Sequence, residues 1–388
     1  MGEIANLYKP VEVFFGEGAI KVAGQVGRRY GFKALIVTGR KSTKENGALD
    51  KLTKSLDEHG IQYLIFDEIE PNPTDKVVNK AAEIAVKEKV DFIVGIGGGS
   101  ALDAAKAISI VSSNEGTAWD YVRYPEGSRL TPFLNRPVIT IPTTAGTGSE
   151  VNRYSVLSNP TTKEKMVIAH SLNYPKVAII DPELTYSMPP RLTALTGFDA
   201  LMHALESLTN KRENFIAEEY AIRAAELIAK WLPVAYEEPE NKKARRYMSY
   251  AAMLAGIAID HLGVALIHAM EHPVSGHYPK IAHAEGLSAL APYVTKFNYK
   301  GNPEKYALFA KILGEEEKPH KAVDALLKFI DRFDLPKTLK ELGVEKEKLD
   351  RLTEDVYLCA RHTFAVNPVE VGMDEVRELY EKAYEGEL

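Results

Sequence analysis

The sequence has little of three features that define other protein classes: cysteine, long apolar runs and excess positive charge. A single cysteine, Cys359, excludes an internal disulfide framework and suits a reducing compartment. No apolar run reaches the roughly 18 residues of a membrane span, and the opening MGEIANLYKP has no apolar signal-peptide core. A net charge of −6 argues against a nucleic-acid partner. We therefore expect a cytoplasmic protein that binds neither membranes nor nucleic acids.

The first half of the chain alternates between strand-like and helix-like segments. Short β-branched runs are separated by amphipathic stretches, and the runs are KALIVTG, IQYLIFDEI, DFIVGIGGGS, PVITIPTTAG and VAIID. Strands that alternate with helices at this spacing form βαβ units and a parallel sheet. The pattern predicts an α/β domain with a Rossmann-like parallel sheet.

The second half has a different pattern. From about residue 193 onward the chain is a series of helical segments with few strand-like runs, such as FIAEEYAIRAAELIAKWL. Pro189 and Pro190 stand at the change, where prolines commonly mark a boundary. With 388 residues, two domains are expected. We predict an α/β domain over 1–187 and an all-α domain over 188–388.

A glycine-rich stretch, GIGGGSALDAAK, follows the third of these strands and opens a helix. The first backbone N–H groups of a helix favour a phosphate. Gly97, Gly98 and Gly99 carry no side chains that would keep a pyrophosphate away, and Ser100 can cap the helix or donate to the phosphate. The Rossmann fingerprint is imperfect because its sixth position is Ser100 rather than glycine or alanine. A tight turn needed only for packing is the alternative.

A second small-residue loop, TTAGTGSE at 143–150, also follows a strand, VITIP. Ligands of α/β proteins bind beyond the carboxyl ends of parallel strands. Two such loops at one edge of the sheet favour a nucleotide-type ligand over a purely structural role.

Histidine is scarce but clustered: four of the ten histidines lie in HAMEHPVSGHYPKIAH, residues 268–283. His268 and His272 are four residues apart, as are Asp199 and His203 in GFDALMHALE, so each pair shares one helix face. One such residue alone is usually solvated or satisfied within the structure. Together, one aspartate and several histidines provide an oxygen and nitrogen donor set suited to Zn²⁺ or Fe²⁺.

The string HAMEH offers a different interpretation. H-x-x-E-H is the signature of inverted zincin proteases, in which His268 and His272 would bind zinc and Glu271 would act as base. Five-residue patterns are frequent by chance. A protease would also leave both glycine-rich loops without a purpose, so this is a remote alternative.

Several motifs in the same order resemble the iron-containing (group III) alcohol dehydrogenase family over nearly the whole chain. They are FFGEGA, PNPT, GGGSALDAAK, IPTTAGTGSE, AIIDPELT, TGFDALMHALE, HAMEHPVSGHY, HAEG and NPVEVGMDEV. Carried over residue by residue, the resemblance implies a metal site of Asp199, His203, His268 and His283. His277 is a neighbouring alternative to His283. His272, one turn after a ligand, is the best candidate for a residue that supports the metal site or relays a proton near the substrate. The cofactor ribose hydroxyls and water are the alternative proton routes.

The resemblance further implies which residues face a dinucleotide cofactor. These are Asn72 near the adenosine end, Gly98, Gly99, Ser100 and Asp103 in the first loop and helix, Thr143, Thr144, Thr147 and Ser149 in the second loop, and Lys165.

One departure from the family pattern concerns cofactor choice. Many members carry an acidic residue after the first strand, where it accepts from the ribose 2′-OH and repels a 2′-phosphate. This chain has Gly39 there, followed by Arg40 and Lys41, which could pair with a phosphate. We predict a preference for NADP(H) over NAD(H). The alternative is a solvated basic turn with weak discrimination.

The resemblance implies a metal-dependent, NAD(P)-linked alcohol dehydrogenase that interconverts short- to medium-chain primary alcohols and aldehydes. Its metal is expected to be Fe²⁺, with Zn²⁺ possible because divalent-metal affinities favour zinc at such a site. Relatives in the wider superfamily supply the alternatives: a glycerol dehydrogenase-like enzyme or a lyase similar to dehydroquinate synthase. We expect a small-molecule substrate and a homo-oligomer, a dimer or larger.

Overall fold

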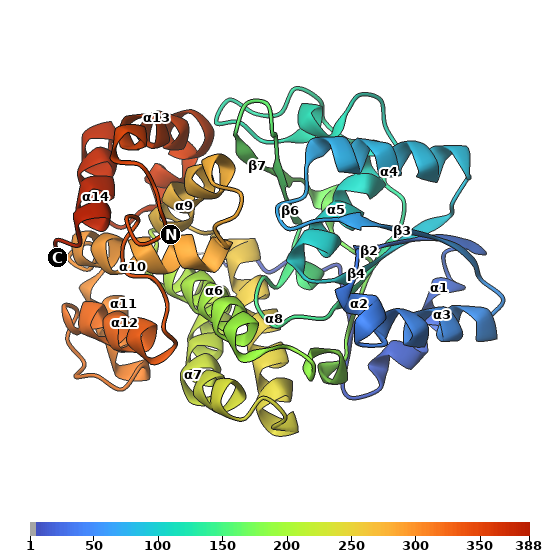
Figure 1. Ribbon diagram of the computed structural model, residues 1–388, viewed down its shortest axis with the longest axis horizontal. Coiled ribbons are helices and arrows are strands. Elements are labelled where there is room, and N and C mark those ends of the chain that lie inside the picture. The colour runs from blue at the N-terminus through green and yellow to red at the C-terminus, as the bar shows by residue number, and fades with distance from the viewer. Residues whose placement is uncertain (1–4) are drawn as a thin grey trace.

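The computed structural model describes residues 5–388 and divides into two parts of different architecture (Figure 1). The N-terminal part, here called the sheet half, is built on a parallel sheet, and the C-terminal part, the helical half, consists of helices. The expected fold class is therefore confirmed. The proposed domain boundary between residues 187 and 188 falls in the turn before the first long helix, α6 (Pro190–Thr209).

Six parallel strands form the main sheet in the order β1-β8-β5-β4-β2-β3. Their bounds are β1 (Glu12–Phe15), β2 (Lys33–Gly39), β3 (Gln62–Ile69), β4 (Phe92–Gly97), β5 (Val138–Pro142) and β8 (Val177–Ile180). The five runs expected from the sequence are β2, β3, β4, β5 and β8. The glycine-rich loops both follow central strands, β4 and β5, which pair directly.

Helices cover both faces of this sheet, which explains why its strands are apolar runs without alternation. Ala34 and Ile36 of β2 pack under one layer, and Leu35 and Val37 under the other. The helices of the sheet half are α1 (Ala23–Gly27), α2 (Ser42–Glu45), α3 (Ala48–Glu58), α4 (Asp75–Lys87) and α5 (Gly99–Val111). In Figure 1, α4 lies above the sheet and α3 below it.

Two features were not predicted. Strand β1 lies at the edge of the sheet, beside β8. Strands β6 (Tyr154–Ser158) and β7 (Lys165–Ala169) form an antiparallel hairpin outside the main sheet. The hairpin contacts α5 on one side and α9 (Leu266–His277) on the other. At Gly276, an added Cβ would lie 2.1 Å from the carbonyl oxygen of Lys163, so the hairpin turn packs directly on the α9 backbone.

The helical half surrounds α6, which is buried along most of its length and packs against α7, α8 and α10. Its other helices are α7 (Phe215–Glu237), α8 (Lys242–Leu262), α9, α10 (His283–Asn298), α11 (Pro303–Ile312), α12 (Lys321–Arg332), α13 (Leu349–Ala360) and α14 (Met373–Glu385). Every residue of α6 from Gly197 to Thr209 is buried, so the polar side chains of Asp199, His203 and Glu206 are held in the interior.

Helices α8 and α9 meet at a sharp bend of 103°. Gly263 ends α8 with φ +81°, a backbone conformation that favours glycine. Within residues 5–388 no single helix is long and apolar enough to cross a bilayer, and only the bent pair of α8 and α9 meets the length and composition criteria together.

The two halves touch closely beside the second glycine-rich loop. Gly148 has φ +60°, and a Cβ added there would lie 2.3 Å from Cα of Gly256 in α8. Glycine at both positions lets the loop after β5 rest on the α8 backbone. This contact fixes the position of the sheet edge relative to the helices that carry the histidines.

Candidate metal centre and cofactor cleft

A cleft of about 1260 Å³ lies between the two halves. Gly99, Ser100 and Thr147 line it from the sheet half, and His203 and His268 are among the lining residues from the helical half. The cleft therefore brings together the glycine-rich loops and the histidine cluster, which the sequence treats as separate features.

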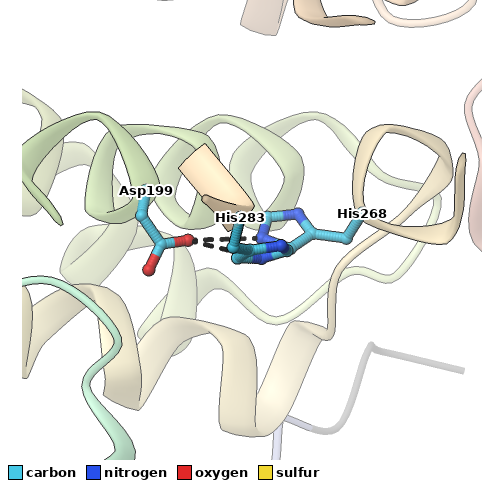
Figure 2. Close-up of side chains that lie close together, drawn as sticks. All are labelled: Asp199, His268 and His283. Atoms are coloured by element: carbon cyan, nitrogen blue, oxygen red, sulfur yellow. Dashed lines mark ion pairs between the residues drawn. The ribbon is translucent and has the colours of Figure 1, made fainter. Parts of the chain in front are cut away.

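Three histidines converge on one carboxylate oxygen. Asp199 Oδ1 lies 3.6 Å from Nε2 of His203, 3.7 Å from Nε2 of His268 and 3.8 Å from Nε2 of His283. Figure 2 shows His268 and His283 reaching the same oxygen from different helices. An ion about 2.1 Å from four tetrahedral ligands would separate them by roughly 3.4 Å. The donor atoms of Asp199, His268 and His283 all lie within 4.8 Å of one another, which is close to metal-binding size. Nε2 of His203, 3.6 Å from the same Asp199 oxygen, adds a fourth donor, and these four residues are called the cage below.

Two donor atoms of the cage lack any other partner. Among the described residues, Asp199 Oδ1 and His268 Nε2 are buried without a hydrogen bond. Leaving such a group unpaired costs about 1–3 kcal/mol. A cation in the cage would satisfy both atoms, and three imidazole nitrogens with one carboxylate oxygen suit Fe²⁺ or Zn²⁺. The residues present therefore fit a divalent metal.

Glu206 supports the cage from behind. Its Oε2 lies 2.5 Å from Nδ1 of His268, and its Oε1 accepts from the backbone N–H of Ile267 at 2.6 Å. A carboxylate on the outer nitrogen fixes the tautomer of a metal-binding histidine, so that Nε2 keeps its lone pair toward the metal. Glu206 lies on α6 and His268 on α9, so the contact also locks the two helices together.

Glu271 orients the imidazole of His283, as Glu206 orients that of His268. Its Oε2 pairs with His283 Nδ1 and lies 3.7 Å from Nζ of Lys165, while its Oε1 accepts from Ser275 Oγ. Both oxygens of this fully buried carboxylate are therefore engaged. In the protease interpretation Glu271 would be a free base facing a metal-bound water, and this arrangement does not provide one.

The charges in the cluster stabilise the ionised form of Asp199. Burial would raise the pKa of Asp199, but the three histidines outweigh burial and lower that pKa below its ordinary value. Burial lowers the pKa of His203 to about 4. Asp199 therefore stays a carboxylate, which is the form that binds a cation.

Local sequence explains how each ligand is placed. Asp199 and His203 are one turn apart on the buried face of α6. His268 lies in the first turn of α9, directly after the bend at Gly263. His283 is the first residue of α10, where Glu285 accepts from the backbone N–H of Ala282 at 3.1 Å and fixes the start of the helix.

The remaining two histidines of the cluster differ in environment. His272 lines the cleft, with its ring centroid 5.7 Å from that of His283. Burial, followed by the Lys165 ammonium, lowers the pKa of His272 well below its ordinary value, so its ring is neutral. His277 Nε2 instead lies 2.7 Å from Asp355 Oδ2 and ties α9 to α13, away from the cage.

On the opposite wall, α5 points its N-terminus into the cleft. The helix begins at Gly99 with Gly98 as its N-cap, and Ser100 sits inside the first turn. The expectation that Ser100 can cap the helix is therefore wrong, since its side chain comes two residues too late. Gly97 has φ +148°, and a Cβ on Gly99 would lie 2.5 Å from Thr147 Cγ2. The packing explanation therefore applies to these two glycines, whether or not a phosphate also binds.

Asp103 joins the two loops. Its Oδ1 accepts from Ser149 Oγ at 2.5 Å, and its Oδ2 accepts from the backbone N–H of Val156 at 2.9 Å. Fully buried Lys106 lies 3.3 Å from the same Oδ1 and donates to the Ser149 carbonyl at 3.0 Å. Asp103 and Ser149 are thus bonded to one another and shape the cleft.

The other residues expected to face the cofactor divide into two groups. Those that line the cleft are Asn72, Gly99, Ser100, Asp103, Thr147, Ser149 and Lys165. Those outside its lining are Gly39, Gly98, Thr143 and Thr144. A Cβ added at Gly98 would lie 3.5 Å from the Thr144 side chain, and buried Thr143 donates its N–H to the Gly97 carbonyl at 2.9 Å. Gly39 is the last residue of β2.

The structure adds residues that the sequence did not single out. Glu206 could have been found from the sequence, because it comes three residues after His203 inside a motif already quoted. Arg123, Arg212 and His362 also line the cleft. They lie outside the α-helices and strands, and no local pattern marked them.

Comparison with known proteins agrees with this arrangement. Residues 10–182 match the family model described as iron-containing alcohol dehydrogenase, and residues 193–384 match the model for the C-terminal part of the Fe-containing alcohol dehydrogenase family. The 1,3-propanediol dehydrogenase of Citrobacter freundii is 37% identical, with 96% of each chain covered. Long-chain-alcohol dehydrogenase 1 of Geobacillus thermodenitrificans is 33% identical, over 99% of this chain and 98% of that protein.

Among solved structures, an archaeal alcohol dehydrogenase from a Red Sea brine pool superposes with a TM-score of 0.94, at 36% identity over 99% of both chains. The likeness covers both halves and the cleft between them. This chain belongs to the iron-containing alcohol dehydrogenase family.

Proposed function

We propose that the protein is a metal-dependent, NAD(P)-linked alcohol dehydrogenase that interconverts short- to medium-chain primary alcohols and aldehydes. The observation that carries the proposal is the cage of Asp199 and three histidines, which opens into the same cleft as the N-terminus of α5. Similar proteins whose names specify 1,3-propanediol and long-chain alcohols support alcohols as the substrate class.

In this proposal Asp199, His203, His268 and His283 hold Fe²⁺, with Zn²⁺ as the competing ion. When bound, the ion acts as a Lewis acid that polarises the oxygen of the alcohol or aldehyde. Glu206 and Glu271 keep the imidazoles of His268 and His283 oriented toward it.

His272 is proposed as the proton relay. Its neutral imidazole lines the cleft beside His283, where a ring nitrogen can take the hydroxyl proton of an alcohol or return it to an aldehyde oxygen. A neutral ring is required for the first of these steps, and burial maintains it.

The cofactor is proposed to lie along the sheet half. The free amides at the start of α5 would bind its pyrophosphate, because Gly98 and Gly99 leave the backbone accessible. Thr147 would contact the nicotinamide portion, supported by the bond between Asp103 and Ser149. Thr144, which lies outside the cleft lining, would support the turn at Gly98. Lys165 would act through Glu271, to which its ammonium is paired. Asn72, whose side chain reaches the carbonyl of Pro279 at 3.4 Å, would close the adenosine end.

We further propose that NADP(H) is preferred over NAD(H). Gly39 leaves room after β2, since a Cβ there would meet only the Ile69 carbonyl oxygen, at 3.4 Å. Arg40 is paired with Glu70 at 3.0 Å, but both side chains are more than 60% exposed, so the pair is weak. A 2′-phosphate could therefore attract Arg40 away from Glu70, with Lys41 adjacent.

A homo-oligomer in the cytoplasm is also proposed. Strand β1 leaves one edge of the sheet uncovered within the described chain, and Val13 and Phe15 on it are each more than a third exposed. Exposed edges of this kind favour pairing with another chain. The single thiol suits a reducing compartment.

The test is reconstitution with Fe²⁺ under anaerobic conditions. Oxidation of NADPH and of NADH is followed with butanal, beside a chelator-stripped sample. We expect turnover that depends on metal and is faster with NADPH. Metal-independent turnover would contradict the proposal, and tight cofactor binding without net turnover would favour the lyase alternative.

A further inference from the structure

We infer that Arg123 and Arg212 bind a carboxylate carried by the substrate at the end opposite its reacting carbon, so that the preferred substrates are small aldehydes with a terminal carboxylate and the corresponding hydroxy acids. This inference rests on the proposed function, because it assigns a substrate class to the same cleft.

The guanidinium groups of Arg123 and Arg212 both line the cleft, and they come from different segments of the chain. The backbone N–H of Arg123 donates to Val167 of β7 at 2.8 Å, which fixes that segment against the hairpin. Arg212 follows α6, and its Nη1 donates to the Leu262 carbonyl at 3.2 Å, at the end of α8. That single bond leaves most of the Arg212 donors free to meet a ligand.

Neither arginine has a carboxylate partner among residues 5–388, although most arginines of the chain do, such as Arg29, Arg153 and Arg246. The acidic residues of the cleft wall are already occupied. Asp103 is bonded to Ser149 and Val156, and Asp199 is surrounded by the histidines. The two positive charges are therefore uncompensated in a cleft whose ligand-facing surface is otherwise largely apolar.

His362 adds a polar group at the same place. Its Nδ1 is buried and has no hydrogen-bond partner among the described residues. Burial, followed by the charges of Arg123 and Arg212, lowers the pKa of His362 to about 4, and all three residues line the same cleft. Arg361 pairs with Glu126 and so holds the segments of Arg123 and His362 together.

The part of the cleft lined by Arg123, Arg212 and His362 is continuous with the metal cage. Arg123 and His362 line the main cleft and also a smaller cavity of about 600 Å³, whose wall includes His268 and His272. Val167 and Val264 line both spaces and can contact a short methylene chain. A substrate whose oxygen faces the cage can thus direct its other end to the arginines, whereas the backbone amides proposed to hold the cofactor phosphates lie at the start of α5 in the sheet half.

A carboxylate is the group that this geometry recognises best. Arginine donates two parallel N–H bonds to the two oxygens of a carboxylate. During reduction, the hydride of the reduced nicotinamide forms the new C–H bond at the aldehyde carbon. The carbon–oxygen π pair moves to the oxygen, which gains one proton, and the cofactor leaves oxidised. The carboxylate is unchanged, so the arginines contribute to binding and orientation.

The experiment compares 4-oxobutanoate with butanal, which has the same number of carbons and no charge. With the Fe²⁺-loaded enzyme and NADPH, kcat/KM for 4-oxobutanoate should exceed that for butanal at least about tenfold. In Arg123→Gln/Arg212→Gln this ratio should fall at least about tenfold, mainly through KM. Arg28→Gln is the matched control, because Arg28 is exposed and stacks on Phe32 in the sheet half; it should leave the ratio within about twofold.

Calorimetry with 4-hydroxybutyrate and the NADPH-loaded holoenzyme, a complex in which no hydride can be transferred, gives a second measurement that does not need turnover. Binding should weaken in the double variant and not in the control. A wild-type enzyme that reduces butanal without preferring 4-oxobutanoate, or an equal loss on both substrates in the double variant, would overturn the inference alone. Absence of turnover with both substrates, with metal and cofactor bound, would instead overturn the proposed function.

Discussion

The two walls of the cleft present different kinds of chemical group to a ligand. The sheet half contributes backbone amides, glycines and hydroxyl groups from loops after β4 and β5. The helical half contributes ionisable side chains from the buried faces of α6 and α9 and from the start of α10. Each ligand-binding carboxylate or imidazole on the helical side is restrained by burial or by a partner on another helix.

The difference follows from what each ligand requires. A phosphate accepts hydrogen bonds from any correctly placed N–H, so side chains near it need only be small. A metal ion requires four specific atoms at fixed separations, so each donor must be held in place by burial or by a partner. The predictions below test whether the two walls can be altered independently.

The largest effect should come from His283→Gln, with His277→Gln as its matched control. His283 contributes Nε2 to the cage, whereas His277 is paired with Asp355. Loss of a ligand should lower both metal affinity and kcat/KM at least about 100-fold, since the metal supplies several kcal/mol of charge stabilisation. Metal content and rate measured after dialysis against Fe²⁺ check this. Equal metal content in both variants would show that His283 is not a ligand.

An intermediate effect is expected from Glu206→Gln and from Glu271→Gln. Each removes a negative charge behind one imidazole, so metal affinity should fall about 10- to 100-fold. Competition with a chelator measures that affinity, and Glu226→Gln, which alters only an exposed pair with Arg223, is the control. Cofactor affinity should change little. If NADPH binding fell as much as metal binding, the two walls would not be independent.

The converse test alters the wall of the cleft that the sheet half forms. In Gly99→Ala the new Cβ would lie 2.5 Å from Thr147 Cγ2, so the loops must separate. Overpacking of this kind costs about 1–3 kcal/mol, and NADPH affinity, measured by fluorescence titration, should fall about tenfold while metal content is retained.

A double-mutant cycle tests the cause of this loss. Thr147→Ala removes Cγ2 and Oγ1, the two atoms that lie closest to a Cβ added at Gly99. The added effect of Gly99→Ala should therefore be smaller in the Thr147→Ala background. An undiminished effect would mean that Gly99 acts through the ligand and not through Thr147.

The fold was largely predictable because strands covered on both faces read as uninterrupted apolar runs. Strand β1 was not predicted, because it is four residues long, lies at the sheet edge and is mostly exposed. The β6–β7 hairpin was missed for a related reason: its strands combine hydroxyl, charged and apolar residues according to contacts with α5 and α9. Such contacts depend on tertiary packing and leave no periodic signal.

The candidate site was likewise predictable only where a local sequence pattern exists. Spacing alone places Asp199 and His203 on one face of a helix. It does not show that Glu206 pairs with His268 and not with His203, its neighbour on α6, because that pairing depends on how α6 and α9 cross. Arg123 and Arg212 reach the cleft from the non-helical segments before β5 and before α7, whose course no local pattern fixes.

The smallest effect concerns the cofactor preference set by the sheet half. Gly39→Asp places a carboxylate after β2, where the structure leaves room for the Cβ beside the Ile69 carbonyl. The charge should repel a 2′-phosphate and accept from a 2′-OH, so the NADP/NAD ratio of kcat/KM should fall about tenfold. Gly39→Asn has nearly the same size without the charge and should shift the ratio much less. An equal shift in both variants would attribute the effect to bulk, and an unchanged ratio in Gly39→Asp would show that selection against NAD lies elsewhere. Either result leaves the metal cage unaffected, because Gly39 lies outside the cleft lining that contains the histidines.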